Sequence, residues 1–295
     1  MEFELEPGLH LIRAPNPSPM TGPGTNTYIL GAQELCLIDP GPDDQDHFAA
    51  LSESIERKGV LRYILVTHTH LDHSALAARL ARSTGAEILG YGDYRAGRSA
   101  LMEQLARSGL SGGGEGVDIR FVPDRALADG AQISVGSDLI RALWTPGHAS
   151  NHLCFEWRGA VFSGDHVMGW SSTFVSPPDG DLGAYMQSLM RLELERPRRL
   201  YPGHGGPVDD PATRISDLRT HRMMREAAIL QNLAEAPQRL SDLVSAIYTD
   251  TPIKMHQAAA RNVFAHLIDL HLRGLVEAEP HLSPDAIFSR IADDE

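Results

Sequence analysis

A short segment of the chain carries four side chains of the types that bind metal ions. His68 and His70 follow an apolar run at residues 63–66, and Asp72 and His73 come directly after them. Because side chains alternate between the two faces of an extended backbone, His68 and His70 project to the same side. Imidazole and carboxylate groups suit zinc, with manganese and iron as alternatives. The segment therefore predicts a metal site.

Three further candidate ligands each follow an expected strand and stand beside glycine: His148, Asp165 and His204. Glycine next to a ligand lets the backbone turn sharply and bring the side chain into a crowded centre. A single catalytic zinc needs only three protein ligands. The chain offers seven, namely His68, His70, Asp72, His73, His148, Asp165 and His204. Seven ligands divide into two sites of three plus one shared carboxylate, so we expect two metal ions, most simply two Zn²⁺.

Two metal ions held close together lower the pKa of a bridging water and provide hydroxide at neutral pH. Such a nucleophile attacks a carbonyl carbon or a phosphorus atom, and Asp165 would orient it. Asp72 is the second residue that we expect to act in catalysis. The ligands do not choose between ester, thioester, amide and phosphodiester, so the substrate depends on the groove around them.

Before residue 210, apolar runs of strand length alternate with helical stretches, which predicts an α/β chain. Strands are expected at 28–30, 35–38, 63–66, 88–90, 119–122, 133–135, 139–144, 152–156 and 160–162, and helices at 44–58 and 74–83. The later strands are closely spaced, so part of the sheet should be antiparallel. A glycine-rich stretch at 109–116 lacks the Lys-Ser/Thr ending of a phosphate loop. We expect a flexible surface connection there rather than a substrate-gating loop.

The character of the chain changes near residue 210. A long helix at 214–234 is followed by helices at 240–248 and 255–273 and a short strand at 274–277. We therefore expect a catalytic domain over residues 1–210, a linking helix over 211–236 and a small helical module over 237–295.

The charge pattern bears on the substrate. Acidic residues outnumber basic ones 39 to 26, a net charge of −13, which argues against broad binding to nucleic-acid phosphates. The stretch 191–225 is basic, with eight arginines against five acids. His221 and Arg222, which could share a helix face with Arg214 and Arg225, are the candidate substrate-binding residues, although a solvated helix face explains the pattern equally well.

The remaining composition favours a reducing, intracellular setting. Cys36 and Cys154 lie in apolar runs and should be buried rather than reactive. The N-terminal residues are acidic and interrupted by proline, unlike a signal peptide. No apolar run approaches the roughly 18 residues that span a membrane. We expect a cytoplasmic protein with no membrane partner.

The order of these residues resembles the metallo-β-lactamase superfamily. The matching motifs are Asp39, then His68-x-His70-x-Asp72-His73, then His148, Asp165 and His204. The resemblance implies an αββα sandwich with its metals at one edge of two facing sheets. It also implies that His68, His70 and His148 hold one metal, that Asp72, His73 and His204 hold the other, and that Asp165 bridges them. Asp39 would orient a ligand histidine without touching metal.

A closer resemblance is to the β-lactamase-like protein 2 family. It rests on residues 16–28, the run 201–205, the pair His221-Arg222 and a winged-helix-like C-terminal module. It implies a metal-dependent single-strand endoribonuclease. The chain departs from that family at Ser74-Ala75. It also has His166 after Asp165, which we interpret as a hydrogen-bonded strand-end histidine rather than a further group near the metals.

We therefore expect a hydrolase of phosphodiesters, with single-stranded RNA or a small molecule as substrate. The alternative is an acyl hydrolase, namely a thioesterase, a lactonase or a weak β-lactamase. Asp165 stands where β-lactamases with a cysteine ligand have that cysteine, which counts against antibiotic hydrolysis. The C-terminal module has five basic and nine acidic residues, so we expect a buttress, a pocket wall or a homodimer surface rather than a duplex-DNA reader.

Overall fold

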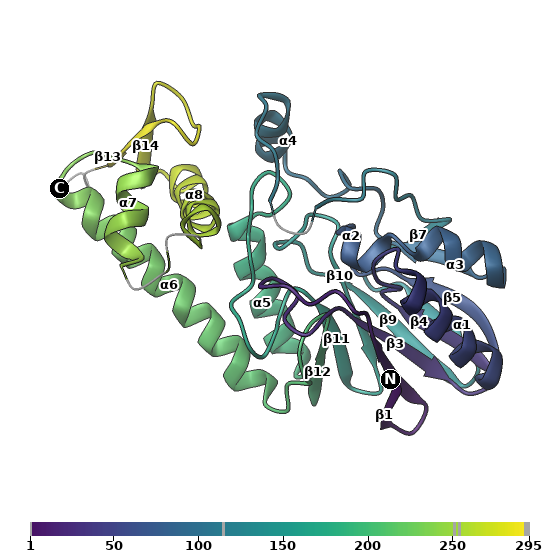
Figure 1. Ribbon diagram of the computed structural model, residues 1–295. Coiled ribbons are helices and arrows are strands. Elements are labelled where there is room, and N and C mark those ends of the chain that lie inside the picture. The colour runs from purple at the N-terminus through teal and green to yellow at the C-terminus, as the bar shows by residue number, and fades with distance from the viewer. Residues whose placement is uncertain (1, 114–115, 250–251, 253–254, 292–295) are drawn as a thin grey trace.

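The structure is a computed structural model that describes residues 2–113, 116–249, 252 and 255–291. Two β-sheets lie face to face with helices on their outer sides, and a small helical module stands at one end of this sandwich (Figure 1). This arrangement confirms the predicted α/β sandwich with a small C-terminal domain.

The first sheet has seven strands in chain order. They are β1 (Glu2–Glu6), β2 (Leu9–Arg13), β3 (Asn26–Gly31), β4 (Glu34–Ile38), β5 (Val60–Leu65), β6 (Glu87–Gly90) and β7 (Arg125–Ala126). Strands β1 to β4 are antiparallel and β4 to β7 are parallel. Leu30 and Cys36 face the second sheet, whereas Ile29 and Leu37 face the outer helices. Because successive side chains of a strand point to opposite faces, the apolar residues of this sheet form one core against the second sheet and another under the outer helices.

The second sheet has the order β12-β11-β10-β9-β8. Its strands are β8 (Gln132–Val135), β9 (Asp138–Trp144), β10 (Leu153–Trp157), β11 (Ala160–Gly164) and β12 (Arg199–Pro202). All pairs except β11–β12 are antiparallel, as the close spacing of the strands predicts. Phe155 and Phe162 face the first sheet, and Cys154 and Val161 face α5 (Leu182–Glu195) and α6 (Pro211–Glu235).

Two local expectations need correction, and one helix was missed. The helix expected at 74–83 is two helices, α2 (Leu71–Ser74) and α3 (Ala77–Thr84), while α1 (Gln45–Lys58) forms as predicted. The strand expected at 119–122 is wrong: residues 119–120 form a turn and 121–122 have no regular structure, with Ile119 and Val122 68% exposed and only Phe121 buried. Helix α4 (Ala100–Arg107), which Ser99 caps by accepting from the Met102 N–H, was not expected. The glycine-rich stretch at 109–116 lies partly outside the described residues.

The C-terminal module contains α7 (Leu240–Ile247), α8 (His256–Leu272) and a small sheet of β13 (Gln238–Arg239), β15 (Ile287–Arg290) and β14 (Val276–Glu279). Its core holds Leu243, Phe264 and Phe288, and Met102 and Leu105 of α4 pack into the same core. Helix α6 runs unbroken for 25 residues from the sandwich into this module (Figure 1). The domain boundaries near residues 210 and 236 stay a prediction.

Two smaller expectations concern the cysteines and the membrane. Cys36 and Cys154 are free and buried, and burial raises the pKa of the Cys154 thiol to about 12. The prediction of buried, unreactive thiols therefore agrees with the structure. Within the described residues, no helix is both long enough and apolar enough to cross a membrane.

Candidate metal centre

The centre begins where strand β5 of the first sheet ends. His68 and His70 follow β5 in extended backbone, and helix α2 then turns the chain so that Asp72 and His73 approach the same point. All four side chains are buried. His68 Nε2 lies 2.9 Å from His70 Nδ1, so the two rings project to the same side, as the alternation predicts.

His148 completes the first group of candidate ligands. It follows β9 of the second sheet, and its Nε2 lies 3.0 Å from His70 Nδ1. Nitrogens bound to one tetrahedral zinc lie about 3.3 Å apart, which follows from Zn–N distances of about 2.0–2.1 Å. His68, His70 and His148 therefore converge at a spacing that fits a metal ion.

Asp72, His73 and His204 form a second group. His204 Nε2 lies 3.3 Å from both His73 Nε2 and Asp72 Oδ2. His204 comes from the loop after β12, so this group joins the two sheets at one edge. Gly203 makes the approach feasible, because a Cβ at this position would lie 2.6 Å from both Asp165 Oδ1 and His73 Cε1.

Asp165 lies between the two groups, directly after β11. Its Oδ2 is 3.3 Å from His204 Nε2 and 3.8 Å from His148 Nε2, while its Oδ1 is 3.4 Å from His73 Nε2. One carboxylate thus faces nitrogens of both groups. This position is compatible with a bridge between two ions.

Buried oxygens fix the direction of several of these rings. Asp39 Oδ2 accepts from His73 Nδ1 at 2.8 Å and from the Thr67 hydroxyl at 2.8 Å. The Thr67 hydroxyl in turn lies 2.9 Å from His68 Nδ1. With Nδ1 held on oxygen, Nε2 keeps its lone pair for the centre. Asp39 therefore occupies the orienting position that the family resemblance implies.

Two backbone carbonyls lie at the Nδ1 atoms of His148 and His204. His148 Nδ1 donates to the Phe174 carbonyl at 2.6 Å, and His204 Nδ1 lies 3.4 Å from the Gly24 carbonyl. The Thr25 hydroxyl donates to Asp72 Oδ2 at 3.1 Å. The sequence did not indicate Phe174 or Thr25, because backbone oxygens and a lone threonine carry no distinctive sequence signal.

Electrostatics differ between the two groups. Burial lowers the pKa of His68 well below its ordinary value and that of His70 to about 3, so both rings are neutral. Burial also acts to lower the pKa of His73 and His204, but the carboxylates of Asp72 and Asp165 outweigh it. They raise the pKa of His73 well above its ordinary value, and Asp165 chiefly raises that of His204 to about 9. This half of the centre attracts positive charge, which a proton or a metal cation supplies.

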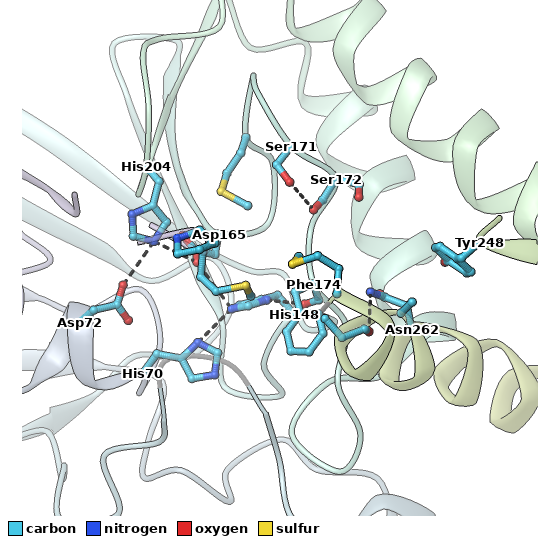
Figure 2. A pocket seen from close by; sticks show the side chains of 16 residues that line it. His70, Asp72, His148, Asp165, Ser171, Ser172, Phe174, His204, Tyr248 and Asn262 are labelled. Carbon is cyan, nitrogen blue, oxygen red and sulfur yellow. Dashed lines mark hydrogen bonds and ion pairs between the residues drawn. The ribbon is translucent and has the colours of Figure 1, made fainter. Parts of the chain in front are cut away.

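A pocket of about 190 Å³ opens onto the centre. Figure 2 shows His70, Asp72, His148, Asp165 and His204 gathered at one end, with Phe174, Tyr248 and Asn262 toward the C-terminal module. The other described lining residues are Pro19, Met20, Met168, Ser171, Ser172, Met255, Ala258 and Ala259. Sulfur, methyl and aromatic groups therefore dominate the walls, and the described lining residues include no lysine or arginine.

The predicted basic face of the long helix is not a free surface. Arg222 is only 3% exposed, and its guanidinium donates to the Thr173 carbonyl and to Asn262 Oδ1. Arg214 donates to the carbonyls of Met168 and Ser171. Neither Arg222 nor the half-buried His221 is among the described pocket-lining residues. Helical spacing predicts that these residues share one face of the helix, but it does not reveal which elements pack against that face. Because Arg222 is buried there, direct contact between Arg222 and the substrate is not supported.

His166 differs from its expected role as well. Its ring is fully buried 4.7 Å from the Tyr185 ring and 5.6 Å from the His152 ring, and it does not line the pocket. Burial lowers its pKa to about 3, so the ring is neutral. It is a buried packing residue rather than a hydrogen-bonded strand-end histidine, because neither ring nitrogen contacts a polar partner among the described residues.

Known families match both parts of the chain. The family described as "Metallo-beta-lactamase superfamily" matches residues 20–204, and that described as "Beta-lactamase associated winged helix domain" matches residues 240–281. The chain belongs to the metallo-beta-lactamase superfamily. As a member with this histidine and aspartate cluster, it is a metal-dependent hydrolase. The winged-helix match confirms the predicted nature of the C-terminal module.

Individual relatives of this superfamily member span most of its length. It is 31% identical to the beta-lactamase-like protein 2 homolog of Drosophila melanogaster, over 88% of this chain and 86% of that protein. It is 30% identical to an atrochrysone carboxyl ACP thioesterase of Aspergillus fumigatus, over 81% of this chain and 70% of that protein. A solved metallo-beta-lactamase family protein from Thermus thermophilus aligns with a TM-score of 0.76 and 26% identity, over 98% of this chain and 100% of that one.

Proposed function

We propose that this metal-dependent hydrolase is dinuclear and acts on acyl substrates, with thioesters as the first class to test. His68, His70 and His148 would hold one ion, and Asp72, His73 and His204 the other, with Asp165 between them. Zinc is the proposed metal because five imidazoles and two carboxylates suit it, and manganese and iron remain alternatives.

When bound, two ions supply a hydroxide nucleophile at neutral pH and polarise the group under attack. The chain itself holds the ligands in place through Asp39, Thr67 and the Phe174 carbonyl. Asp165 and Asp72 face the pocket, where their carboxylates would orient the attacking nucleophile. The apolar walls exclude competing water from the acyl group.

The observation that carries the acyl assignment is the absence of lysine and arginine from the described residues that line the pocket. A phosphodiester is an anion, and proteins recognise phosphates mainly with arginine, lysine and backbone N–H groups. The described wall instead offers Met20, Met168, Met255 and Phe174. An apolar acyl group fits this surface, and the similarity over 81% of this chain to a protein named as an ACP thioesterase supports the same class.

A phosphodiesterase acting on single-stranded RNA is the second candidate. The similarity to the beta-lactamase-like protein 2 homolog extends over nearly the whole chain, and the sequence resembles that family in its entry segment and C-terminal module. The burial of Arg222 argues against this candidate, because the predicted substrate-binding face requires Arg222 at the surface.

A substrate panel separates the two candidates. Zinc-loaded protein is assayed on acyl thioesters of increasing length, a homoserine lactone, a β-lactam, a bis-aryl phosphate and single-stranded RNA, beside an Asp165→Ala control. We expect thioester hydrolysis that the control lacks. Hydrolysis of phosphodiesters with none of acyl substrates would overturn the acyl assignment. Elemental analysis that finds fewer than two metal ions per chain would overturn the dinuclear centre.

The surroundings of the enzyme also remain proposals. We propose a cytoplasmic location, from the two free and buried cysteines. A homodimer is proposed as the assembly in which the C-terminal module takes part, and duplex DNA is not proposed as a partner. Light scattering at several protein concentrations tests the dimer.

A further inference from the structure

We propose that Arg222 and Asn262 are positioning residues that aim His148 at the metal centre. Neither side chain belongs to the candidate ligands. Arg222 lies on α6 and Asn262 on α8 of the C-terminal module. The inference rests on the proposed metal centre, but it is independent of which substrate the enzyme hydrolyses.

Arg222 is the first element of this arrangement. Its side chain is almost fully buried, and one terminal nitrogen donates to the Thr173 carbonyl while the other donates to Asn262 Oδ1 at 3.0 Å. The guanidinium also lies over the Tyr185 ring, 5.5 Å from its centroid. Among the described residues, no carboxylate lies within ion-pair distance of it. Burying a cation without a counter-ion is costly, so its two hydrogen bonds must compensate.

Asn262 is the second element. Its Oδ1 accepts from Arg222 and also from the Val175 backbone N–H at 3.2 Å. Arg222 and Asn262 therefore hold the segment 173–175 at both of its ends, Arg222 through the Thr173 carbonyl and Asn262 through the Val175 N–H. Figure 2 shows Asn262 on its helix beside Phe174, which lies between the two ends of this segment.

The segment 173–175 touches two candidate ligands. The Phe174 carbonyl accepts from His148 Nδ1 at 2.6 Å. The Thr173 hydroxyl lies 3.1 Å from the Asp165 carbonyl and 2.8 Å from that of His166. A shift of this segment would turn the His148 ring, because the Phe174 carbonyl is the hydrogen-bond partner that the structure gives to His148 Nδ1.

The chemical consequence concerns metal affinity. A carbonyl that accepts from Nδ1–H fixes the tautomer and the ring direction, which leaves the Nε2 lone pair for the metal. Loss of such an outer partner costs about 10–100-fold in metal affinity. Arg222 and Asn262 act on His148 only through the segment 173–175. We therefore expect losing either side chain to lower the metal affinity by an amount near the lower end of this range, about tenfold.

Four variants test the inference. Arg222→Met keeps the length of the side chain and removes its donors, and Asn262→Leu keeps the size and removes the acceptor. Asn262→Asp retains the acceptor and is the conservative rescue. Arg219→Met, one turn earlier on α6 with a partly exposed side chain paired to Glu193, is the matched control.

Metal-free forms of each protein are titrated with Zn²⁺ against a chromophoric chelator and with Co²⁺ by visible absorption. We expect Arg222→Met and Asn262→Leu to weaken binding at one of two sites about tenfold and to change the Co²⁺ spectrum. Asn262→Asp and Arg219→Met should match the wild type. If Arg222→Met does not fold, the comparison of Asn262→Leu with Asn262→Asp decides the question.

One outcome would overturn the inference: Arg222→Met and Asn262→Leu bind zinc and Co²⁺ like the wild type and differ only in a lower unfolding temperature. These residues would then have a purely structural role. A wild-type protein that binds no metal would overturn the metal centre and this inference together. Failure of the acyl assignment in the substrate panel would leave the metal titrations, and therefore the inference, unaffected.

Discussion

Asp39 lies directly behind His73, with Oδ2 2.8 Å from the ring Nδ1. The carboxylate also accepts from the Thr67 backbone N–H at 2.8 Å. One buried acid therefore holds both the ligand ring and the backbone that leads into the histidine segment. Asp39 adopts a left-handed backbone conformation, with φ of 54°, which aspartate tolerates better than most residues.

Asp39→Asn should weaken metal binding about 10–100-fold, because an amide is a poorer partner for Nδ1–H and loosens the His73 ring. The measurement is zinc titration against a chelator. Asp43→Asn, four residues later at the surface and paired with Arg79, is the control and should bind zinc like the wild type. Unchanged affinity in Asp39→Asn would show that Asp39 does not orient His73.

Gly203→Ala should displace Asp165 and His73, because the added Cβ would lie 2.6 Å from each of them. We expect lower metal content by elemental analysis and loss of most hydrolytic activity. Gly206→Ala is a sharp control, since a Cβ there meets nothing within 4 Å. Equal metal content in the two variants would contradict the close packing of Gly203 against the candidate ligands.

Ala258→Leu should shorten the pocket from the side of α8. Ala258 lines the pocket, and leucine adds bulk toward the apolar wall. We expect kcat/KM for long-chain thioesters to fall about tenfold or more, which is the effect of a clash worth at least about 1.4 kcal/mol, while short-chain substrates are hydrolysed normally. Gln257→Leu, an exposed position outside this pocket, is the control. A uniform loss across all chain lengths would argue against an acyl subsite here.

Glu6 should stabilise the fold in a pH-dependent manner. Arg198 donates to both carboxylate oxygens, at 2.7 and 2.6 Å, and with the Tyr201 hydroxyl it lowers the pKa of Glu6 from 4.5 to about 2. Because the folded pKa lies below the unfolded one, the stabilisation is complete above about pH 4.5 and disappears as the pH falls toward 2.

Glu6→Gln should therefore lower the free energy of unfolding at pH 7 by up to about 1 kcal/mol, since the ion pair is partly solvated. The difference from the wild type should shrink as the pH falls from 4.5 toward 2. Denaturant unfolding at several pH values measures it, with the exposed Glu4→Gln on the same strand as control. A difference that grows on acidification would contradict the assigned sign.

The sequence predicted the ligands because they are concentrated in a few short motifs. His68, His70, Asp72 and His73 stand within six residues, and glycine marks His148 and His204. These are local signals, and the backbone conformation of a strand followed by a turn is enough to bring the side chains together. The sandwich followed from the same alternation of strands and helices.

What the sequence could not predict depends on packing between distant segments. Spacing placed Arg222 on a helix face but could not show that α8 and residues 173–175 cover that face. The Phe174 carbonyl is a backbone atom, so no residue type reveals its role. The run at 119–122 looks like a strand because three of its four residues are apolar, yet it joins no sheet among the described residues.

Helix α8 contributes Ala258 and Ala259 to the pocket wall, although it lies more than fifty residues after the last candidate ligand, His204. Part of the pocket wall is therefore encoded in a different stretch of the gene from the candidate ligands, while Met20, Met168 and Phe174 come from the same stretch as the ligands. On the proposed acyl function, substitutions confined to α8 change the shape of the pocket without touching a candidate ligand. Relatives with the same seven ligands can thus diverge in substrate, and likeness in the catalytic motif alone is a poor guide to what each of them hydrolyses.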